Sequence, residues 1–415
     1  MLLIGLLLFG MGAPPQAAHG APLEQSGGAP VPGQCGVLPM PGGSLGLFCV
    51  PVSGWNGDLI VWAHGYRRIT ENLAFQDLEL SDGTNLATLA QSLGFAFVAT
   101  TYRQNGLAVV EGLDDVRELV VTFRFLAGRA PRYTYMAGAS EGGLVTTLLI
   151  ERSPELFSGG LALCGPTGDF RKELEYVGDF RVLFDVFFPG VLPGNGARIP
   201  DQLIRDWDRV YVPRVEAAVA ANPLGALSLI SSSKAAIDPA SAPSVLATIK
   251  KLLEYSTFST NDAIAKLRGN PFGNLFRLYT GSLDDLKLNQ LVFRIAADPA
   301  TLLTLLPYQT TGQITRPLVT MHTTADELVP FWHQVLYQIK ARPSGRGKLT
   351  PIAINRYGHC NFTGLEALVA FGLLVEQVTG AQPAGVTQRL DAGTVKRDYQ
   401  RAAQDATTKI PRDSR

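Results

Sequence analysis

Residues 133–142 read YTYMAGASEG, and this stretch decides the fold. Its first half is an apolar run that predicts a buried strand, and a helical periodicity begins where it ends. Between the two lies Gly-x-Ser-x-Gly, with Ser140 at its centre. A serine in such a tight strand-to-helix turn has strained backbone angles, so the residues two positions away must be small. We expect Ser140 to be an exposed nucleophile; the alternative is a purely structural turn.

Short apolar runs alternate with helical patterns on both sides of this turn. Runs that predict strands lie at 58–63, 94–101, 133–137, 159–163, 318–322 and 351–355. Segments with helical periodicity lie at 107–126, 142–152 and 363–378, and Thr363 with Glu366 forms a capping-box signature at the start of the last one. Strands that alternate with helices predict an α/β fold with a mostly parallel sheet flanked by helices.

The alternation stops between residues 168 and 313. Helical patterns dominate there, at 201–221 and 244–255 among others, with Pro-Gly breakers between them. An ordinary connection inside a compact domain is far shorter. We therefore expect a core of residues 21–167 and 314–380. A large helical cap domain, 168–313, is inserted before the penultimate strand, and a poorly ordered C-terminal tail, 381–415, follows.

A serine hydroxyl needs a base near neutral pH, and His359 is placed to act as one. It follows the last predicted strand, after Gly358, which allows a sharp turn. A carboxylate must hold the imidazole in one tautomer. Asp326, just after the penultimate strand, is the candidate, with Glu327 as the alternative; Asp326 could instead cap a helix that begins near Val329. The competing histidines, His322 on a strand and His333 on a helix, are interpreted as ordinary structural residues.

Four motifs resemble the esterase and lipase branch of the α/β-hydrolase superfamily: His-Gly-Tyr at 64–66, Gly-Ala-Ser-Glu-Gly-Gly at 138–143, Asp-Glu-Leu-Val-Pro at 326–330 and Gly-His-Cys at 358–360. The resemblance covers residues 45–165 and 315–380. It implies an α/β-hydrolase fold and a serine hydrolase that cleaves carboxylic esters through an acyl-enzyme. Its triad would be Ser140, His359 and Asp326 in the family's chain order of Ser, Asp and His, with no metal or organic cofactor.

Two backbone N–H groups are expected to stabilise the oxyanion of such a reaction. One belongs to Glu141, directly after the nucleophile, and the other to Tyr66, in the loop after the strand at 58–63. Gly65 in that loop would allow a close approach to the substrate. Arg103, which follows the strand at 94–101, is a candidate for binding a substrate carboxylate, with a surface ion pair as the alternative.

The four cysteines predict disulfides. Cys35 and Cys49 flank a Gly/Pro-rich turn and are expected to staple a hairpin, which leaves Cys164 to pair with Cys360. Two buried free thiols are the alternative to the second bond. The pair His359-Cys360 is also similar to the tannase and feruloyl-esterase group, in which a disulfide joins the residues beside the catalytic Ser and His. This chain departs from that pattern because an alanine precedes Ser140.

Residues 1–20 combine a short apolar run with Ala18-His19-Gly20, which predicts a signal peptide and a secreted or periplasmic protein. A misassigned start codon or a frayed end is the alternative. Lys plus Arg equals Asp plus Glu, 36 each, so no basic excess indicates a nucleic acid partner. No other apolar run predicts stable membrane insertion. We expect a small-molecule ester as the partner and leave the oligomeric state open.

Three other functions fit the same fold. The first is a peptidase or amidase of the prolyl or aminopeptidase type, which should carry acidic cap residues to hold a substrate amine. The second is a polyester depolymerase. The third is a catalytically inactive binding protein, against which a complete triad in order argues.

Overall fold

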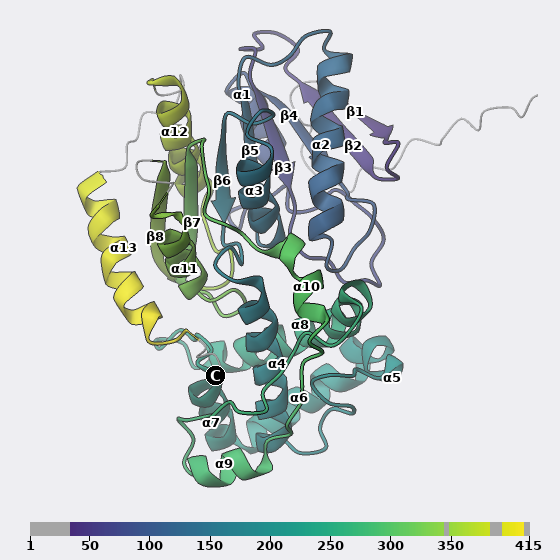
Figure 1. Cartoon of the computed structure of the whole chain (residues 1–415), viewed down its shortest axis with the longest axis vertical. Coiled ribbons are helices and arrows are strands. Elements are labelled where there is room, and N and C mark those ends of the chain that lie inside the picture. Colours follow the sequence, from purple (N-terminus) through teal and green to yellow (C-terminus); the bar gives the residue numbers. More distant parts are fainter. Residues whose placement is uncertain (1–33, 344–347, 382–391, 411–415) are drawn as a thin grey trace, which may run out of the picture. The chain divides into compact units, whose positions relative to one another are not determined.

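The computed structural model describes residues 34–343, 348–381 and 392–410 (Figure 1). By its internal contacts the chain divides into two units, Met1–Val31 and Pro32–Arg415, and every described residue belongs to the second unit. The predicted signal peptide, residues 1–20, lies outside the described residues.

The described residues form one eight-stranded sheet in the order β1-β2-β4-β3-β5-β6-β7-β8 (Figure 1). From β4 to β8 in this order each strand pairs parallel with the next, whereas β2, near one edge, pairs antiparallel with both β1 and β4. The strands are β1 (Gln34–Pro39), β2 (Leu45–Val50), β3 (Leu59–Ala63), β4 (Ala96–Thr100), β5 (Thr134–Ala139), β6 (Gly159–Leu163), β7 (Leu318–Ala325) and β8 (Leu349–Tyr357). The predicted fold class, an α/β-hydrolase with a mostly parallel sheet, is confirmed.

All six predicted strands are present. Those at 159–163 and 58–63 match β6 and β3 to within a residue, because every residue of these strands is buried and apolar or glycine. The hairpin expected at the first two cysteines is β1 with β2, in which Cys35 and Cys49 are direct cross-strand partners.

Helices cover both faces of the sheet. On one face α2 (Val109–Leu126) and α3 (Glu141–Arg152) pack against β3, β4 and β5, and on the other face lie α1 (Leu86–Ser92) and α12 (Gly364–Thr379). The capping box predicted for the last helix is formed by Thr363 and Glu366. Helix α11 (Trp332–Ala341) precedes β8.

Between β6 and β7 the described residues form helices and no strand, as the sequence predicts for this segment. The helices are α4 (Phe170–Phe187), α5 (Asp201–Arg205), the π-helical turn η1 (Trp207–Tyr211), α6 (Val212–Ala221), α7 (Pro223–Ser233), α8 (Pro243–Leu267), α9 (Asp285–Leu291), α10 (Thr301–Thr304) and the 3-10 turn η2 (Leu306–Tyr308). Many of their apolar side chains share a hydrophobic cluster separate from that of the sheet. We keep residues 168–313 as the proposed cap domain and call them the cap segment.

Two predicted cap helices have different limits in the structure. The helix expected at 201–221 is interrupted by η1, where Trp207 is fully buried and the hydrogen bonding is wider than in an α-helix. The helix expected at 244–255 continues to Leu267, because Phe258 and Ala263 extend its buried face.

The described part of the C-terminal tail forms a helix, whereas the sequence predicts a poorly ordered tail. Helix α13 (Ala392–Thr407) lies against β8 and α11 and buries Tyr399 and Ala406 (Figure 1). These two side chains form the apolar face of an otherwise polar helix. They are buried in the same hydrophobic cluster as the apolar side chains of the cap segment.

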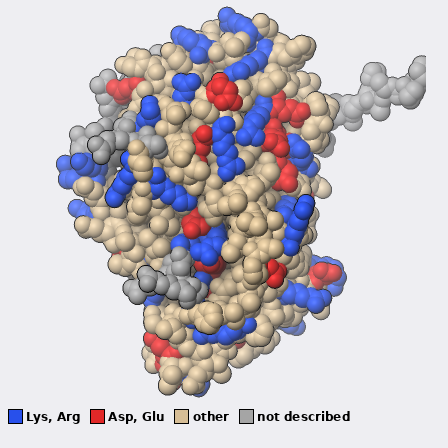
Figure 2. All heavy atoms as spheres, in the orientation of Figure 1, with Lys and Arg blue, Asp and Glu red and all other residues tan. Residues whose placement is uncertain are grey.

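Among the described residues no single helix is both long and apolar enough to cross a membrane. Two consecutive helical segments, Trp207–Ala221 and Pro223–Ser233, reach the required length and apolar character only together, and the chain bends by 103° between them. Basic and acidic side chains are interspersed on the face shown in Figure 2. This agrees with the balanced charge of the sequence.

Candidate active site

Ser140 lies in the turn between β5 and α3, as predicted, with φ 58° and ψ −122°. Only small neighbours fit this turn. A Cβ on Gly142 would overlap the carbonyl oxygen of Ala63, and one on Gly138 would overlap the carbonyl oxygen of Gly142. The backbone N–H of Ser140 donates to the carbonyl oxygen of Leu163, 2.9 Å away on β6. The turn that carries Ser140, which we call the nucleophile turn after its predicted role, is therefore fixed between neighbouring strands.

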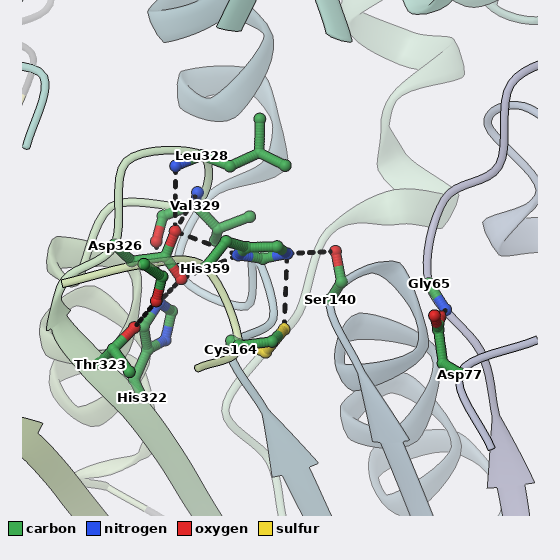
Figure 3. The surroundings of a disulfide bond; sticks show 12 residues. Gly65, Asp77, Ser140, Cys164, His322, Thr323, Asp326, Leu328, Val329 and His359 are labelled. Carbon is green, nitrogen blue, oxygen red and sulfur yellow. Dashed lines mark hydrogen bonds and ion pairs between the residues drawn. A yellow bond between two sulfur atoms is a disulfide. The ribbon is translucent and has the colours of Figure 1, made fainter. Parts of the chain in front are cut away.

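His359 and Asp326 converge on this serine (Figure 3). The Nε2 atom of His359 lies 2.8 Å from Oγ of Ser140, and its Nδ1 atom lies 2.8 and 3.0 Å from the two carboxylate oxygens of Asp326. Gly358 before the histidine has φ 106°, which a residue with a side chain rarely adopts. The three residues singled out in the sequence form one hydrogen-bonded row at the carboxyl edge of the sheet.

Asp326 is buried and accepts several hydrogen bonds at once. The backbone N–H groups of Leu328 and Val329 donate to its Oδ1 atom, at 3.0 and 2.8 Å. Asp326 therefore closes a turn as well as contacting His359, but it does not cap a helix, because α11 begins only at Trp332. Burial by itself raises the pKa of Asp326, but the charges and hydrogen bonds of His359 and His322 lower it well below its usual range. The carboxylate is thus ionised across the neutral range.

His322 on β7 has a role that the sequence did not reveal. Its Nε2 atom lies 2.8 Å from the carbonyl oxygen of Val329 and 3.4 Å from Oδ2 of Asp326. A carbonyl oxygen can only accept, so Nε2 carries the proton and directs it toward the carboxylate as well. His322 is buried, as expected for a structural residue, but it also lies next to the carboxylate of Asp326. The spacing of four residues between His322 and Asp326 is the one feature of the sequence that could have indicated this contact.

Glu327 and His333 do not join this row. Oε2 of Glu327 has no hydrogen-bond partner within the described part of the chain, and burial with the charge of Asp326 raises the pKa of Glu327. His333 is buried on α11, with its Nε2 atom 2.9 Å from Oε2 of Glu173. The geometry therefore favours Asp326 over Glu327 as the partner of His359.

The balance of burial and charge decides when His359 is neutral. Burial lowers the pKa of His359, but the charge and hydrogen bond of Asp326 outweigh it and leave the pKa above the ordinary value of 6.5. A neutral imidazole, which can accept a proton from a serine hydroxyl, is therefore the main form only when the pH exceeds this raised pKa.

The loop that carries Tyr66 approaches Ser140 at Gly65, and Glu141 follows Ser140 in the chain. The N–H of Gly65 donates to Oδ2 of Asp77 at 2.8 Å (Figure 3), whereas no hydrogen bond within the described residues occupies the N–H of Tyr66 or Glu141. A Cβ on Gly65 would lie 3.0 Å from Cβ of Ser140, so the loop approaches the serine as closely as expected. Both N–H groups are thus free, among the described residues, to bind another acceptor, and they remain candidates for oxyanion donors.

A cavity of about 320 Å³ opens beside Ser140 and His359. The core lines it with both apolar and charged side chains, and the cap segment contributes one face of α8. The apolar core residues include Trp62, Leu163 and Phe362, the charged core residues are Arg67, Arg68, Glu71, Asp77 and Glu79, and the α8 residues are Lys251, Glu254, Tyr255 and Phe258. A molecule that reached Ser140 through this cavity would therefore contact both the core and the cap segment.

Arg103 does not line this cavity. Its guanidinium forms an ion pair with Asp115 of α2, and its backbone N–H donates to the same carboxylate at 2.8 Å. Asp115 is fully buried and needs a cationic partner. The prediction that Arg103 binds a substrate carboxylate is therefore wrong, and the alternative, an ion pair, is what the structure contains.

Both predicted disulfides are present. Cys35 is bonded to Cys49, with a Cα–Cα distance of 4.1 Å, and Cys164 to Cys360, with a distance of 5.4 Å. Cys164 follows β6 and Cys360 follows His359 in the chain. The described residues include one group that could hold a metal, Cys164, His359 and Cys360, and its two sulfurs are joined in this disulfide.

The sheet order and the strand–Ser140–helix turn define an α/β-hydrolase fold. No protein-family model and no curated protein matches the chain. Similar solved structures include acylaminoacyl peptidase from Pyrococcus horikoshii, 12% identical with a TM-score of 0.43 over 88% of this chain. Feruloyl esterase B from Aspergillus oryzae is 14% identical, with a TM-score of 0.47 over 82% of this chain and 80% of its own. An esterase of Pyrococcus furiosus is 10% identical, with a TM-score of 0.43 over 84% of this chain and 91% of its own. This chain spans 44% of the length of the acylaminoacyl peptidase.

Proposed function

We propose that the chain is a serine hydrolase that cleaves carboxylic esters through an acyl-enzyme. One observation carries the proposal: the row in which Oγ of Ser140 lies 2.8 Å from Nε2 of His359, whose Nδ1 atom lies 2.8 Å from Asp326. Nucleophile, base and orienting carboxylate are in hydrogen-bond contact beside a cavity, which is the arrangement that acyl transfer to serine requires.

In the first half of the reaction, Oγ of Ser140 attacks the ester carbonyl carbon while Nε2 of His359 takes the hydroxyl proton. The ionised Asp326 stabilises the imidazolium that forms. The N–H groups of Tyr66 and Glu141 donate to the carbonyl oxygen as it becomes an oxyanion. When the intermediate collapses, the bond to the alcohol oxygen breaks and His359 returns the proton to the leaving alcohol.

In the second half, water replaces the alcohol. His359 takes a proton from the water molecule, whose oxygen attacks the acyl carbon, and the same two N–H groups stabilise the second oxyanion. The ester bond to Ser140 then breaks, the carboxylic acid leaves and Oγ regains its proton from His359. No metal or organic cofactor is proposed for these steps.

The described cap segment places no unpaired carboxylate in the cavity that could hold the amine of a peptide. Glu254 is the carboxylate that the described cap segment places in the cavity, and Arg68 pairs with it at 2.7 Å. The guanidinium of Arg68 also pairs with Asp208 at 2.8 Å. A neutralised carboxylate is a weak site for a substrate ammonium group, so we rank the peptidase alternative second.

Two substrate panels test the proposal. One contains p-nitrophenyl esters of graded acyl length together with aryl esters of aromatic acids, and the other contains aminoacyl and prolyl p-nitroanilides. We expect hydrolysis of esters, with the Ser140→Ala variant as the matched blank. Turnover of the anilides alone would support the peptidase, and turnover of neither panel would contradict the hydrolase.

We also propose that the protein works outside the cytoplasm, as a secreted or periplasmic enzyme. Two disulfides support this, because such bonds persist in oxidising compartments. The test is the N-terminal sequence of the protein from fractionated cells of its source: we expect a chain that begins near residue 21 outside the cytoplasm, and a full-length cytoplasmic chain would contradict the proposal.

A further inference from the structure

Three successive backbone N–H groups just before α2 donate hydrogen bonds to three different segments of the chain. The N–H of Gly106 donates to the carbonyl oxygen of Arg67, 2.9 Å away in the loop that carries Tyr66. The N–H of Leu107 donates to Oδ2 of Asp262 on α8, at 2.6 Å. The N–H of Ala108 donates to Oε1 of Glu141 at 3.0 Å. We call residues 106–108 the α2 junction.

Glu141 is the unexpected partner in this junction. Its backbone N–H is one of the two proposed oxyanion donors, and its side chain extends away from the cavity into the interior, where the residue is 5% exposed. The first turn of α2 needs an acceptor, because the residue before the helix, Ala108, has no side chain that could cap it. Glu141 provides that acceptor from a different helix.

The same junction positions the other proposed donor. The loop of Tyr66 is bound to Gly106 through the carbonyl oxygen of Arg67. Gly106 has φ 80°, and a Cβ there would overlap the carboxylate of Asp262, so this position accommodates only glycine. Both oxyanion donors are therefore fixed relative to the beginning of α2.

We propose that Glu141 is a positioning residue for the oxyanion hole: its buried side chain, anchored on the N–H of Ala108, fixes the direction of its own backbone N–H beside Ser140. This inference rests on the proposed function, because it concerns the stabilisation of an oxyanion at Ser140. It goes beyond that function by giving a role to the side chain of a residue whose backbone alone was expected to act.

The charge state of this side chain matters to the role. Burial raises the pKa of Glu141, whereas the hydrogen bond from Ala108 and the charge of Lys266 lower it. The net result is a pKa of about 8. The titratable and charged groups that face it are Glu111 on α2, Tyr255, Asp262 and Lys266 on α8, Tyr308 on η2, Tyr102 after β4 and Tyr66. Lys266 also binds Asp262, at 3.1 Å, and the carbonyl oxygen of Asn105, at 3.0 Å.

The sign of the pH effect follows from the raised pKa. Below pH 8 the carboxyl group is protonated and neutral, so Glu141 itself adds no negative charge behind the oxyanion hole. Above pH 8 it becomes a carboxylate, and a second negative charge near the developing oxyanion destabilises the transition state in a buried, weakly screened environment. We therefore expect the turnover number of the wild type to fall as the pH rises through about 8.

Two substitutions of Glu141 separate positioning from packing. In Glu141→Gln the amide oxygen still accepts from Ala108 and the side chain stays neutral, so we expect kcat at pH 7 within about threefold of the wild type and no fall near pH 8. Glu141→Ala removes the anchor, and we expect kcat to drop by at least roughly tenfold with little change in KM, since a misdirected oxyanion donor affects the transition state more than the bound substrate. The matched control is Glu155, an exposed glutamate, changed to Gln and Ala without effect on either constant.

The experiment measures kcat and KM for p-nitrophenyl butyrate from pH 6 to 9.5, with Ser140→Ala subtracted as the blank. A Glu141→Ala variant with the kcat of the wild type would contradict the positioning role. A Glu141→Gln variant whose kcat falls near pH 8 as in the wild type would contradict it as well. If the alanine variant does not fold, the pH profile of the glutamine variant decides alone. A wild type that hydrolyses no ester contradicts the proposed function instead, which keeps the two failures distinct.

Discussion

The sulfur of Cys360 lies 3.4 Å from Nε2 of His359, the ring nitrogen that faces Ser140. Cys360 is bonded to Cys164, which follows Leu163, and the carbonyl oxygen of Leu163 accepts the N–H of Ser140. A closed path of covalent and hydrogen bonds thus connects the histidine to the nucleophile turn through the end of β6. The disulfide limits how far the loop of His359 can move away from Ser140.

Removing this disulfide should lower both stability and turnover. The bond closes a loop with a sequence separation of 196, and its loss in a Cys164→Ser/Cys360→Ser variant should cost about 2–5 kcal/mol of unfolding free energy. We expect kcat to fall at least severalfold under conditions where the variant is fully folded, because His359 is then less well positioned. Chemical denaturation and steady-state kinetics measure the two effects separately.

The other disulfide is the matched control. Cys35–Cys49 has a sequence separation of 14 and joins two strands at the sheet edge remote from Ser140 in the strand order. Its removal should reduce stability but leave kcat unchanged in the folded protein. Equal losses of kcat in the two double variants would contradict a positioning role for Cys164–Cys360.

The pH dependence of wild-type activity should report the raised pKa of His359. The base must be neutral to take the serine proton, so kcat/KM should rise with pH and level off only above the ordinary histidine value of 6.5. A kcat/KM that is constant from pH 5 to 8 would be incompatible with a histidine base.

Changing Asp326 to Asn should abolish most turnover without unfolding the chain. The amide can donate to Nδ1 of His359, which favours the wrong tautomer, and it no longer stabilises the imidazolium. We expect kcat to fall on the order of a thousandfold or more. The same kind of change at Glu327, to Gln, is the control, since its Oε2 atom has no hydrogen-bond partner in the described part of the chain; a larger loss there would transfer the role to Glu327.

His322 should contribute through Asp326. His322→Phe keeps a ring of similar size on β7 but removes the N–H that lies 3.4 Å from Oδ2 of Asp326. Because the lost N–H group attracts the carboxylate that orients His359 and also holds the carbonyl oxygen of Val329, we expect kcat to fall roughly tenfold, with KM little changed. A folded variant with wild-type kcat, checked by near-UV circular dichroism, would leave His322 a packing residue only.

Two glycine substitutions test the geometry of the nucleophile turn. Gly142→Ala would force a Cβ against the carbonyl oxygen of Ala63 on β3, so we expect either loss of folding or a shifted Ser140 and at least a hundredfold loss of turnover. At Gly36 on β1 an added Cβ meets nothing within 4 Å. Gly36→Ala should therefore match the wild type in melting temperature and activity, and similar behaviour of the two variants would contradict the tight turn.

The sequence predicts the sheet well because its central strands are continuous apolar runs. It predicts the cap segment less well, since α8 buries Ser256, Thr257 and Ser259, and these polar residues hide the continuation of its apolar face. Helix α13 was missed for a related reason. It is polar in composition, and Tyr399 becomes an apolar anchor only through a tertiary contact.

For the candidate site, chain order and motif spacing located Ser140, His359 and Asp326. They could not locate partners that depend on how segments pack. Arg103 stands at the expected end of a strand, but Asp115 on the following helix holds its guanidinium. The side chain of Glu141 meets Ala108 at a sequence separation of 33, and no local pattern records such a contact.

The most direct test of the central claim is labelling with a fluorophosphonate, which reacts with serines activated by a neighbouring base. The folded protein is incubated with the probe at pH 8, digested and analysed by mass spectrometry, in parallel with the Ser140→Ala and His359→Ala variants. We predict a single adduct on the peptide that contains Ser140 in the wild type, none in Ser140→Ala and a strongly reduced rate in His359→Ala. A folded wild type that forms no adduct, or forms it on another residue, would contradict the assignment of Ser140 as an activated nucleophile.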